Sequence, residues 1–95
     1  MTDKDTTTEG RLLSDFMGLK ITLFPNRVEY IKKVFLGVKT ESILLLDISE
    51  VIVDYVDGMT KGKGYVRIKT NDGKKHDLGL TTKAAEVQEA IVAAL

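Results

Sequence analysis

The sequence predicts a small, mainly β domain (β+α) in which about six to seven antiparallel strands form a barrel or sandwich capped by one C-terminal helix. Apolar residues recur with a period of two from Leu19 onward, and breaks rich in glycine, proline and asparagine divide this repeat into short segments. At Thr81-Thr82 the period changes to about 3.6, as expected where a helix begins. A strongly bent sheet of this size closes on itself or leaves an open end that one helix can cover.

The first predicted hairpin turns at Pro25-Asn26. LKITLF before this turn and RVEYIKKV after it both place apolar side chains at every second position, which is the pattern of half-buried strands. Proline presets φ and asparagine tolerates a tight turn, so the two segments are expected to pair. The expected inward residues are Leu19, Ile21, Leu23, Val28 and Tyr30.

Two further strands are predicted after the break at Gly37. TESILLL (40–46) is a continuous apolar run near its end, and we expect a strand that is covered on both faces for part of its length. ISEVIVDYV (48–56) is dense in β-branched and aromatic residues, which suit a pleated surface.

The second predicted hairpin turns at Asn71-Asp72-Gly73, because asparagine and aspartate accept turn geometry and glycine supplies positive φ. GYVRIKT precedes the turn and KKHDLGL follows it, with Val66, Ile68, Leu78 and Leu80 expected inward. RLLSDFMG (11–18) is either a seventh short strand or a helical turn, and its pattern is too brief to decide between them.

The C-terminal helix presents one stripe of apolar residues spaced three and four positions apart, namely Ala84, Val87, Ile91 and Leu95. Thr82 is the expected N-cap, and Glu86 nearby favours the positive end of the helix. We expect the stripe to pack on the sheet. A partner helix or a membrane is the alternative, although the helix lacks the basic polar face of a membrane binder.

Length and composition indicate one domain. Of the 95 residues, 11–95 are expected to form the domain and 1–10 a flexible tail, because the tail has few apolar side chains. Fourteen basic and 14 acidic residues cancel, and the absence of cysteine excludes a disulfide, a thiolate nucleophile and a Cys-based zinc site. No apolar run is long enough for a transmembrane segment, so we expect a cytoplasmic domain, at most peripheral to a membrane.

The order of features over residues 16–95 resembles the bacterial pleckstrin-homology-like (PH-like) domains. These features are the opening hairpin GLKITLFPNRVEYI, the strand SILLLDISEV, a glycine loop, the hairpin GYVRIKTNDGKKHDLGL and the final helix. The resemblance implies a split antiparallel barrel capped by the helix, on a scaffold that serves lipid-binding and protein-binding families. It also implies homo-oligomers, which bacterial members build. It does not imply phosphoinositide recognition, because Lys20, Arg27, Lys32 and Lys33 do not reproduce the spacing of that basic motif.

The loop GMTKGKG (58–64) mixes glycine and lysine as nucleotide-binding loops do. A phosphate-binding loop of the form GxxxxGK[ST] lies between a strand and a helix. Here Gly58 and Gly62 are one residue too close, Gly64 follows Lys63 without a hydroxyl, and the next element is a strand. We therefore interpret the segment as a soluble connection and expect no nucleotide cofactor.

The sequence contains no recognised motif for catalysis, metal binding or nucleic-acid binding. His76 is the only histidine, and it is expected to be an exposed side chain that points away from its neighbour Asp77 on a strand. The serines lie in no nucleophile motif, the carboxylates are scattered, and no DNA-binding or RNA-stacking motif is present. We expect a noncatalytic protein without cofactor or metal.

Two binding functions from different classes are compatible with the sequence. The first is a protein-interaction module, binding a protein partner or a second copy of itself through strand edges or the last helical turns. The second is an anionic surface module, weakly binding a lipid headgroup or a phosphate ligand, because residues 57–75 carry six basic and two acidic residues. A solvated outer face is the simpler interpretation of these lysines. The candidate anionic-partner residues are Lys61, Lys63, Arg67, Lys69, Lys74 and Lys75.

Overall fold

The computed structural model describes residues 10–56 and 62–95, and within these ranges it contains seven strands and a C-terminal α-helix. The mainly β class with one C-terminal helix is confirmed, and the segment at 11–16 is a strand and not a helical turn. In chain order the elements are β1 (Arg11–Phe16), β2 (Leu19–Leu23), β3 (Arg27–Val34), β4 (Gly37–Leu44), the 3-10 turn η1 (Leu45–Asp47), β5 (Ile48–Tyr55), β6 (Gly64–Thr70), β7 (Lys75–Thr81) and α2 (Ala84–Ala94).

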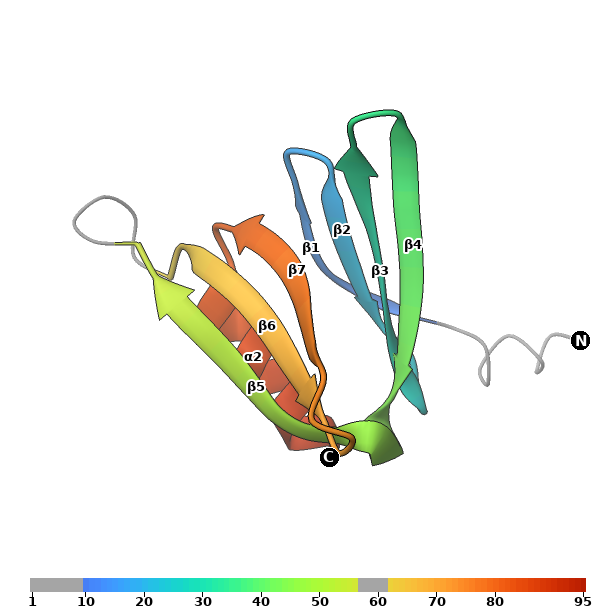
Figure 1. The fold of residues 1–95 in the computed structure, drawn as a ribbon. Coiled ribbons are helices and arrows are strands. Elements are labelled where there is room, and N and C mark those ends of the chain that lie inside the picture. Colours follow the sequence, from blue (N-terminus) through green and yellow to red (C-terminus); the bar gives the residue numbers. More distant parts are fainter. Residues whose placement is uncertain (1–9, 57–61) are drawn as a thin grey trace, which may run out of the picture.

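The strands form two antiparallel sheets that η1 connects (Figure 1). The first sheet has the order β1-β2-β3-β4, and the second has the order β5-β6-β7. The helix α2 contacts β5, β6 and β1, while β7 contacts β1, β2 and β3. Both sheets and the helix therefore share one core.

The core contains the side chains that the alternation predicted to face inward in the first hairpin. Val28 and Ile21 are fully buried, Tyr30 and Leu19 nearly so, and Leu23 packs against them partly buried. The second sheet and the helix complete this core with Val51, Val66, Ile68, Leu78, Ala84, Val87 and Ile91. The predicted packing of the helical stripe on the sheet is confirmed for its first three members.

The strand predicted in the run TESILLL is confirmed for residues 40–44, but the predicted cover on both of its faces was wrong. In β4 only Ile43 is buried, Leu44 is half-exposed, and the strand ends there. Leu45 begins η1, its N–H donating to the carbonyl of Asn26 (2.9 Å), and Leu46 is 89% exposed. The physical reason is that β4 is the last strand of its sheet and one face only meets the core, while the chain must turn to reach the second sheet.

The inward position of Leu80 was also wrong, because β7 contains a bulge. Val66 pairs with Gly79 while Arg67 pairs with Asp77, so one extra residue lies in β7 and the alternation shifts by one. Gly79 has a φ of 124°, which glycine adopts readily. Leu80 consequently lies opposite Tyr65 on the outer face, and the inward position passes to Thr81, which is fully buried.

The ends of α2 differ from the prediction. Lys83 and not Thr82 occupies the N-cap position, without a side-chain cap, and the N–H of Ala84 donates to the carbonyl of Gly62 (2.8 Å). The hydroxyl of Thr81 instead accepts from the Lys83 N–H (3.1 Å). Leu95 is the C-cap beyond the last helical residue and is half-exposed, so the predicted stripe is buried only as far as Ile91.

Candidate interaction surfaces

The basic residues predicted to form one anionic-partner patch are spread along the second hairpin. Lys63 precedes β6, and its ammonium lies 5.9 Å from the centroid of the Phe16 ring. Lys74 lies at the other end, beyond the seven residues of β6, which span roughly 20 Å. Lys61 lies outside the described residues. The described members of the set therefore do not form one compact cluster.

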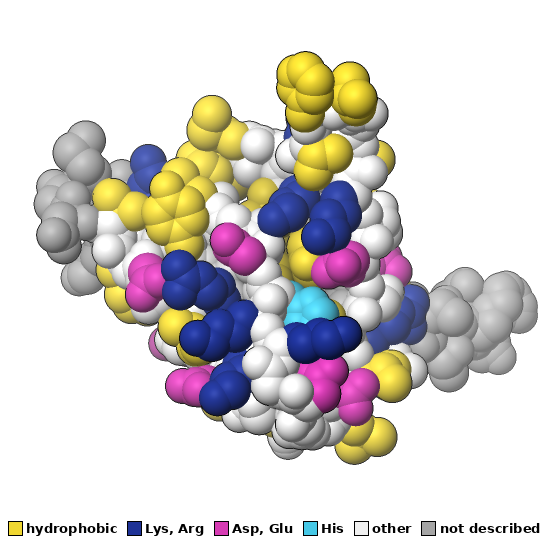
Figure 2. Space-filling view, in the orientation of Figure 1, with side chains coloured by type: hydrophobic (Ala, Val, Ile, Leu, Met, Phe, Trp, Pro, Cys, Tyr) yellow, Lys and Arg dark blue, Asp and Glu magenta, His cyan; other side chains and the backbone are white. Residues whose placement is uncertain are grey.

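On the outer face of the second sheet, acidic residues alternate with the basic ones. The Arg67 guanidinium lies 3.1 Å from the Asp54 carboxylate, and Asp77 is its partner in β7. Lys69 has Glu50 as its partner in β5. Figure 2 shows acidic side chains beside Lys and Arg side chains over this sheet. Three basic residues on this face (Arg67, Lys69 and Lys75) thus meet three acidic ones (Glu50, Asp54 and Asp77), which leaves no local excess of charge.

Lys74 lines a hollow of about 500 Å³ where the β6–β7 turn meets η1 and the end of β4. Asp47 and Asp72 line the same hollow, so its walls carry both signs of charge. The hydroxyl of Thr70 donates to Asp72 (2.6 Å), and this hydrogen bond lowers the pKa of the Asp72 carboxyl. The hollow therefore does not select an anion by charge.

His76 was predicted to be exposed, but it is three-quarters buried in a polar contact between the two sheets. Its Nδ1 lies 3.6 Å from a carboxylate oxygen of Glu41, which also accepts a hydrogen bond from the Tyr30 hydroxyl. Burial raises the pKa of the Tyr30 hydroxyl, and the hydrogen bond from Tyr30 lowers the pKa of the Glu41 carboxyl. These three residues connect β3, β4 and β7. His76 and Asp77 face opposite sides, as predicted, because their partners in β6 are the buried Ile68 and the outer Arg67.

Strand β4 presents a free edge. It pairs with β3 on one side, and no strand in the described part of the chain pairs with its other side (Figure 1). Val34 and Gly37 close a two-residue loop, so the backbone N–H and C=O of Gly37 both hydrogen-bond to Val34 of β3. Successive residues of a strand point their backbone N–H and C=O groups to alternate sides. The residues of β4 whose backbone groups face the free edge are therefore Val38, Thr40, Ser42 and Leu44.

A second surface lies where the two hairpins of the first sheet turn. Phe35 and Leu36 form the β3–β4 turn, and Met17 begins the β1–β2 turn. All three side chains are almost fully exposed. Figure 2 shows hydrophobic side chains projecting at the β3–β4 turn, with Lys and Arg side chains directly beneath them. The alternation analysis could not find this surface, because apolar residues in a turn have no periodic signature.

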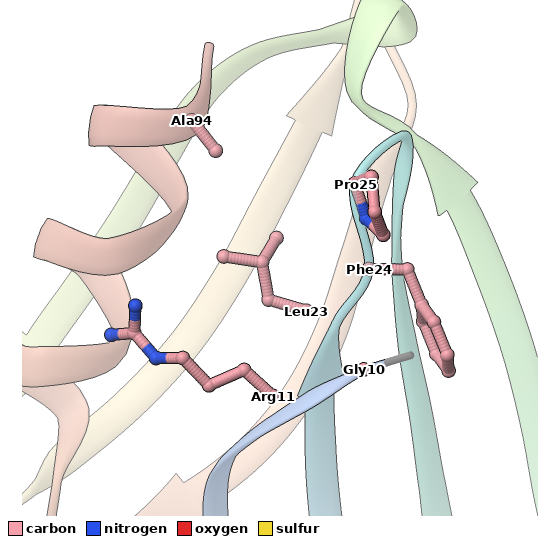
Figure 3. A pocket seen from close by; sticks show the side chains of 6 residues that line it. All are labelled: Gly10, Arg11, Leu23, Phe24, Pro25 and Ala94. Atoms are coloured by element: carbon pink, nitrogen blue, oxygen red, sulfur yellow. The ribbon is translucent and has the colours of Figure 1, made fainter. Parts of the chain in front are cut away.

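A shallow hollow of about 470 Å³ lies between the start of β1, the β2–β3 turn and the end of α2 (Figure 3). Leu23 and Ala94 point toward each other across it, and the Arg11 side chain extends along one wall. Phe24 turns its ring to the opposite side, where the Arg27 guanidinium lies 4.0 Å from the ring centroid. Among the described residues that line this hollow, Arg11 carries the only charge.

Within residues 10–56 and 62–95, no three His, Cys, Asp or Glu side chains converge as metal ligands would, and no helix is long and apolar enough to cross a membrane. Comparison of the chain with protein-family models, with curated proteins and with solved structures gave no match.

Proposed function

We propose that the chain is a noncatalytic PH-like interaction module that assembles with a second copy of itself along the free edge of β4. The PH-like split barrel is supported by the arrangement of four and three antiparallel strands with a C-terminal helix against the second sheet. The observation that carries the function is the length and regularity of the β4 edge. Eight residues without proline or a bulge leave four positions with outward backbone donors and acceptors.

Charge favours one register of this pairing over the two neighbouring registers. Two antiparallel copies of β4 related by a two-fold axis at Thr40 place Lys39 of each copy opposite Glu41 of the other. Moving the axis by one residue instead places Lys39 opposite Lys39 or Glu41 opposite Glu41, and like charges directly opposite each other are destabilising. The register at Thr40 also pairs residues whose backbone groups face the free edge, as a hydrogen-bonded pair requires.

The solution mass, measured by size-exclusion chromatography with light scattering, tests this proposal. We expect the wild-type chain to form dimers at high concentration. Thr40→Pro removes an outward N–H without breaking the pairing with β3, so it should give a folded monomer. Thr40→Ala, which keeps the N–H, is the matched control and should remain dimeric.

A charge variant tests the register. Lys39→Glu places two carboxylates opposite each other and should weaken the dimer, while Lys20→Glu carries the same charge change on β2 and should not. A wild-type chain that stays monomeric at high concentration, or a dimer that is indifferent to Thr40→Pro, would contradict the proposal.

The alternative function, an anionic partner on the hairpin at 57–75, stays a prediction with less support. Its described basic residues are divided between two ends of a strand and a face on which acidic residues balance them.

A further inference from the structure

The turns of the two hairpins in the first sheet lie at the same end of the molecule (Figure 1). The N–H of Lys33 near the β3–β4 turn donates to the carbonyl of Gly18 in the β1–β2 turn (3.2 Å), which holds the turns together. Because Leu19 pairs with Lys32, β3 continues two residues beyond β2, and the β3–β4 turn projects about 7 Å further. We call the five apolar residues at this end the hairpin tips: Met17, Val34, Phe35, Leu36 and Val38.

The hairpin tips expose large apolar side chains to solvent. Phe35 is 96% exposed, Leu36 87% and Met17 86%. Single exposed apolar residues are common on protein surfaces, but several at one projecting point indicate an interaction site. Neither turn needs these residue types for its own backbone conformation.

Met17 is the clearest case of a residue type that its turn does not require. It has a φ of 47° and is followed by Gly18 with a φ of 88°, which is the pattern of a type I′ turn. Asparagine is favoured at the first of these positions, whereas a long apolar side chain with positive φ is strained. Such strain is retained where the side chain has a role other than stabilising the fold.

Lysines surround the base of the hairpin tips. Within the first three residue pairs from each turn there are four lysines and one aspartate, a local balance of four minus one, or plus three. Lys20 and Lys33 lie on one face of the sheet, while Lys32 and Lys39 lie on the other. We call these four residues the lysine collar. Asp15 is the partner of Lys20, and Glu41, just beyond these pairs, lies 3.7 Å from the Lys39 ammonium. The Lys32 ammonium donates to the carbonyl of Asp77 (2.7 Å) and keeps its charge.

We propose that the hairpin tips insert into the interfacial layer of an anionic membrane while the lysine collar contacts the lipid phosphates. Lys33 lies two residues behind the turn residues Phe35 and Leu36, and Lys32 and Lys39 lie three residues behind them, about 7–10 Å, with Lys20 one residue further at the level of Ile31. Interfacial segments bury their apolar side chains about 5–10 Å deep. Lysine stems extend along apolar surface and keep the ammonium in the headgroup layer. Charge favours this occupant over an apolar protein groove, because the basic residues at this end outnumber the acidic ones and the membrane surface is anionic.

This site is distinct from the hairpin at 57–75, and it does not rest on the self-association proposed above. A monomeric Thr40→Pro chain should still bind vesicles, with lower avidity.

Binding to vesicles tests the proposal. The full chain should sediment with phosphatidylcholine vesicles that contain phosphatidylglycerol, should not sediment with phosphatidylcholine alone, and should be released by salt. Phe35→Ser together with Leu36→Ser should weaken binding at least about tenfold, because two buried apolar side chains are lost. Leu46→Ser, which changes an equally exposed leucine in η1, is the control and should bind as the wild type does.

Charge-neutralising pairs separate the lysine collar from the second hairpin. Lys20→Gln with Lys33→Gln should weaken binding about threefold to tenfold and reduce its dependence on salt. Lys69→Gln with Lys75→Gln makes the same change in net charge on the second sheet and should leave binding unchanged. Met17→Asn controls for misfolding, because asparagine is favoured at the first position of a type I′ turn. This variant should have a higher melting temperature than the wild type and should still bind vesicles more weakly.

Insertion itself has a direct readout, because the chain contains no tryptophan. The emission of Phe35→Trp should shift to the blue with anionic vesicles, and that of Leu46→Trp should not. Absence of vesicle binding, equal loss in the Leu46 and Lys69/Lys75 controls, or no emission shift at position 35 would overturn the proposal. The proposal would also be overturned if the wild type did not bind vesicles and the Phe35/Leu36 variant changed its solution mass. That result would assign the hairpin tips to a protein contact.

Discussion

The β3–β4 and β6–β7 hairpins both carry several lysines, but they present these charges differently. In β6–β7, Arg67 and Lys69 lie on a sheet face where the neighbouring strands supply Asp54, Glu50 and Asp77. In β3–β4, by contrast, Lys33 lies near a turn whose apolar side chains project beyond the rest of the sheet, while Lys39 lies 3.7 Å from the Glu41 carboxylate. The β6–β7 hairpin is also packed against α2 and the first sheet, whereas the β3–β4 turn touches the core nowhere.

The difference shows that charge counted along the chain is not the charge that a surface presents. Residues 57–75 have the higher local excess of basic residues in the sequence, but acidic residues outside that range (Glu50, Asp54 and Asp77) lie beside Arg67 and Lys69 on the sheet. The β3–β4 hairpin has three lysines, as many as the β6–β7 hairpin, and its turn geometry places Lys33 close to exposed apolar side chains. Three predictions test this comparison, in order of decreasing effect.

The largest expected effect is on the free energy of unfolding, and it shows which hairpin stabilises the fold. Ile68 in β6 is fully buried, so Ile68→Ala should lower the free energy of unfolding by about 2–5 kcal/mol through lost burial and a residual cavity. Leu36→Ala at the β3–β4 turn should change it by less than about 0.5 kcal/mol. Chemical denaturation monitored by circular dichroism measures both. A similar loss for the two variants would break the distinction between a structural hairpin and a projecting one.

The next effect concerns the point where the two hairpins meet. Tyr30→Phe removes the hydroxyl that donates to Glu41 beside His76, and we expect a loss of about 1–2 kcal/mol at neutral pH. The loss should depend on pH. Because the hydrogen bond lowers the pKa of Glu41, its contribution is present above the ordinary glutamate pKa of about 4.3 and disappears as the pH falls through the lower folded value.

Unfolding curves at neutral and acidic pH measure this dependence. The difference in stability between the wild type and Tyr30→Phe should therefore be largest near neutrality and should shrink below about pH 4. A difference that stays constant on acidification would show that the lost stability came from packing and not from the charged hydrogen bond.

The smallest effect concerns the balanced charges themselves. The Arg67–Asp54 pair is substantially exposed, so Arg67→Gln should cost less than about 1 kcal/mol, and high salt should remove most of that loss. Lys33→Gln, which breaks no ion pair in the described structure, should leave stability unchanged at any salt concentration. Unfolding midpoints at low and high salt compare the two variants, and a salt-independent loss for Arg67→Gln would show that its role is packing.

Local rules were sufficient for most of the strands and for the helix. The alternation identified Ile21, Val28, Val66 and Ile68 as inward residues, because a half-buried strand imposes a period of two on its own sequence. The same rules failed at Leu80, where a bulge in β7 shifts the alternation. They also failed for TESILLL, since an apolar run does not reveal whether its strand lies at an edge.

The candidate surfaces were less predictable than the fold. The residues at 57–75 could be counted, but their partners Asp54 and Glu50 lie on another strand, and the Asp77 that opposes Arg67 lies beyond the counted range. The hairpin tips carry no motif. Only the observation that Phe35 and Leu36 occupy a turn, beside a second turn with Met17, indicates a common surface.

By itself, the sequence determined the mainly β class, the two hairpin turns at Pro25-Asn26 and Asn71–Gly73 and the buried stripe of the helix, because each depends on neighbours within a few positions. Only the tertiary structure decided which strand is an edge, which charges are balanced and which turns lie together. Those properties depend on residues far apart in the chain, and the pattern of apolar and polar positions does not specify how two sheets meet.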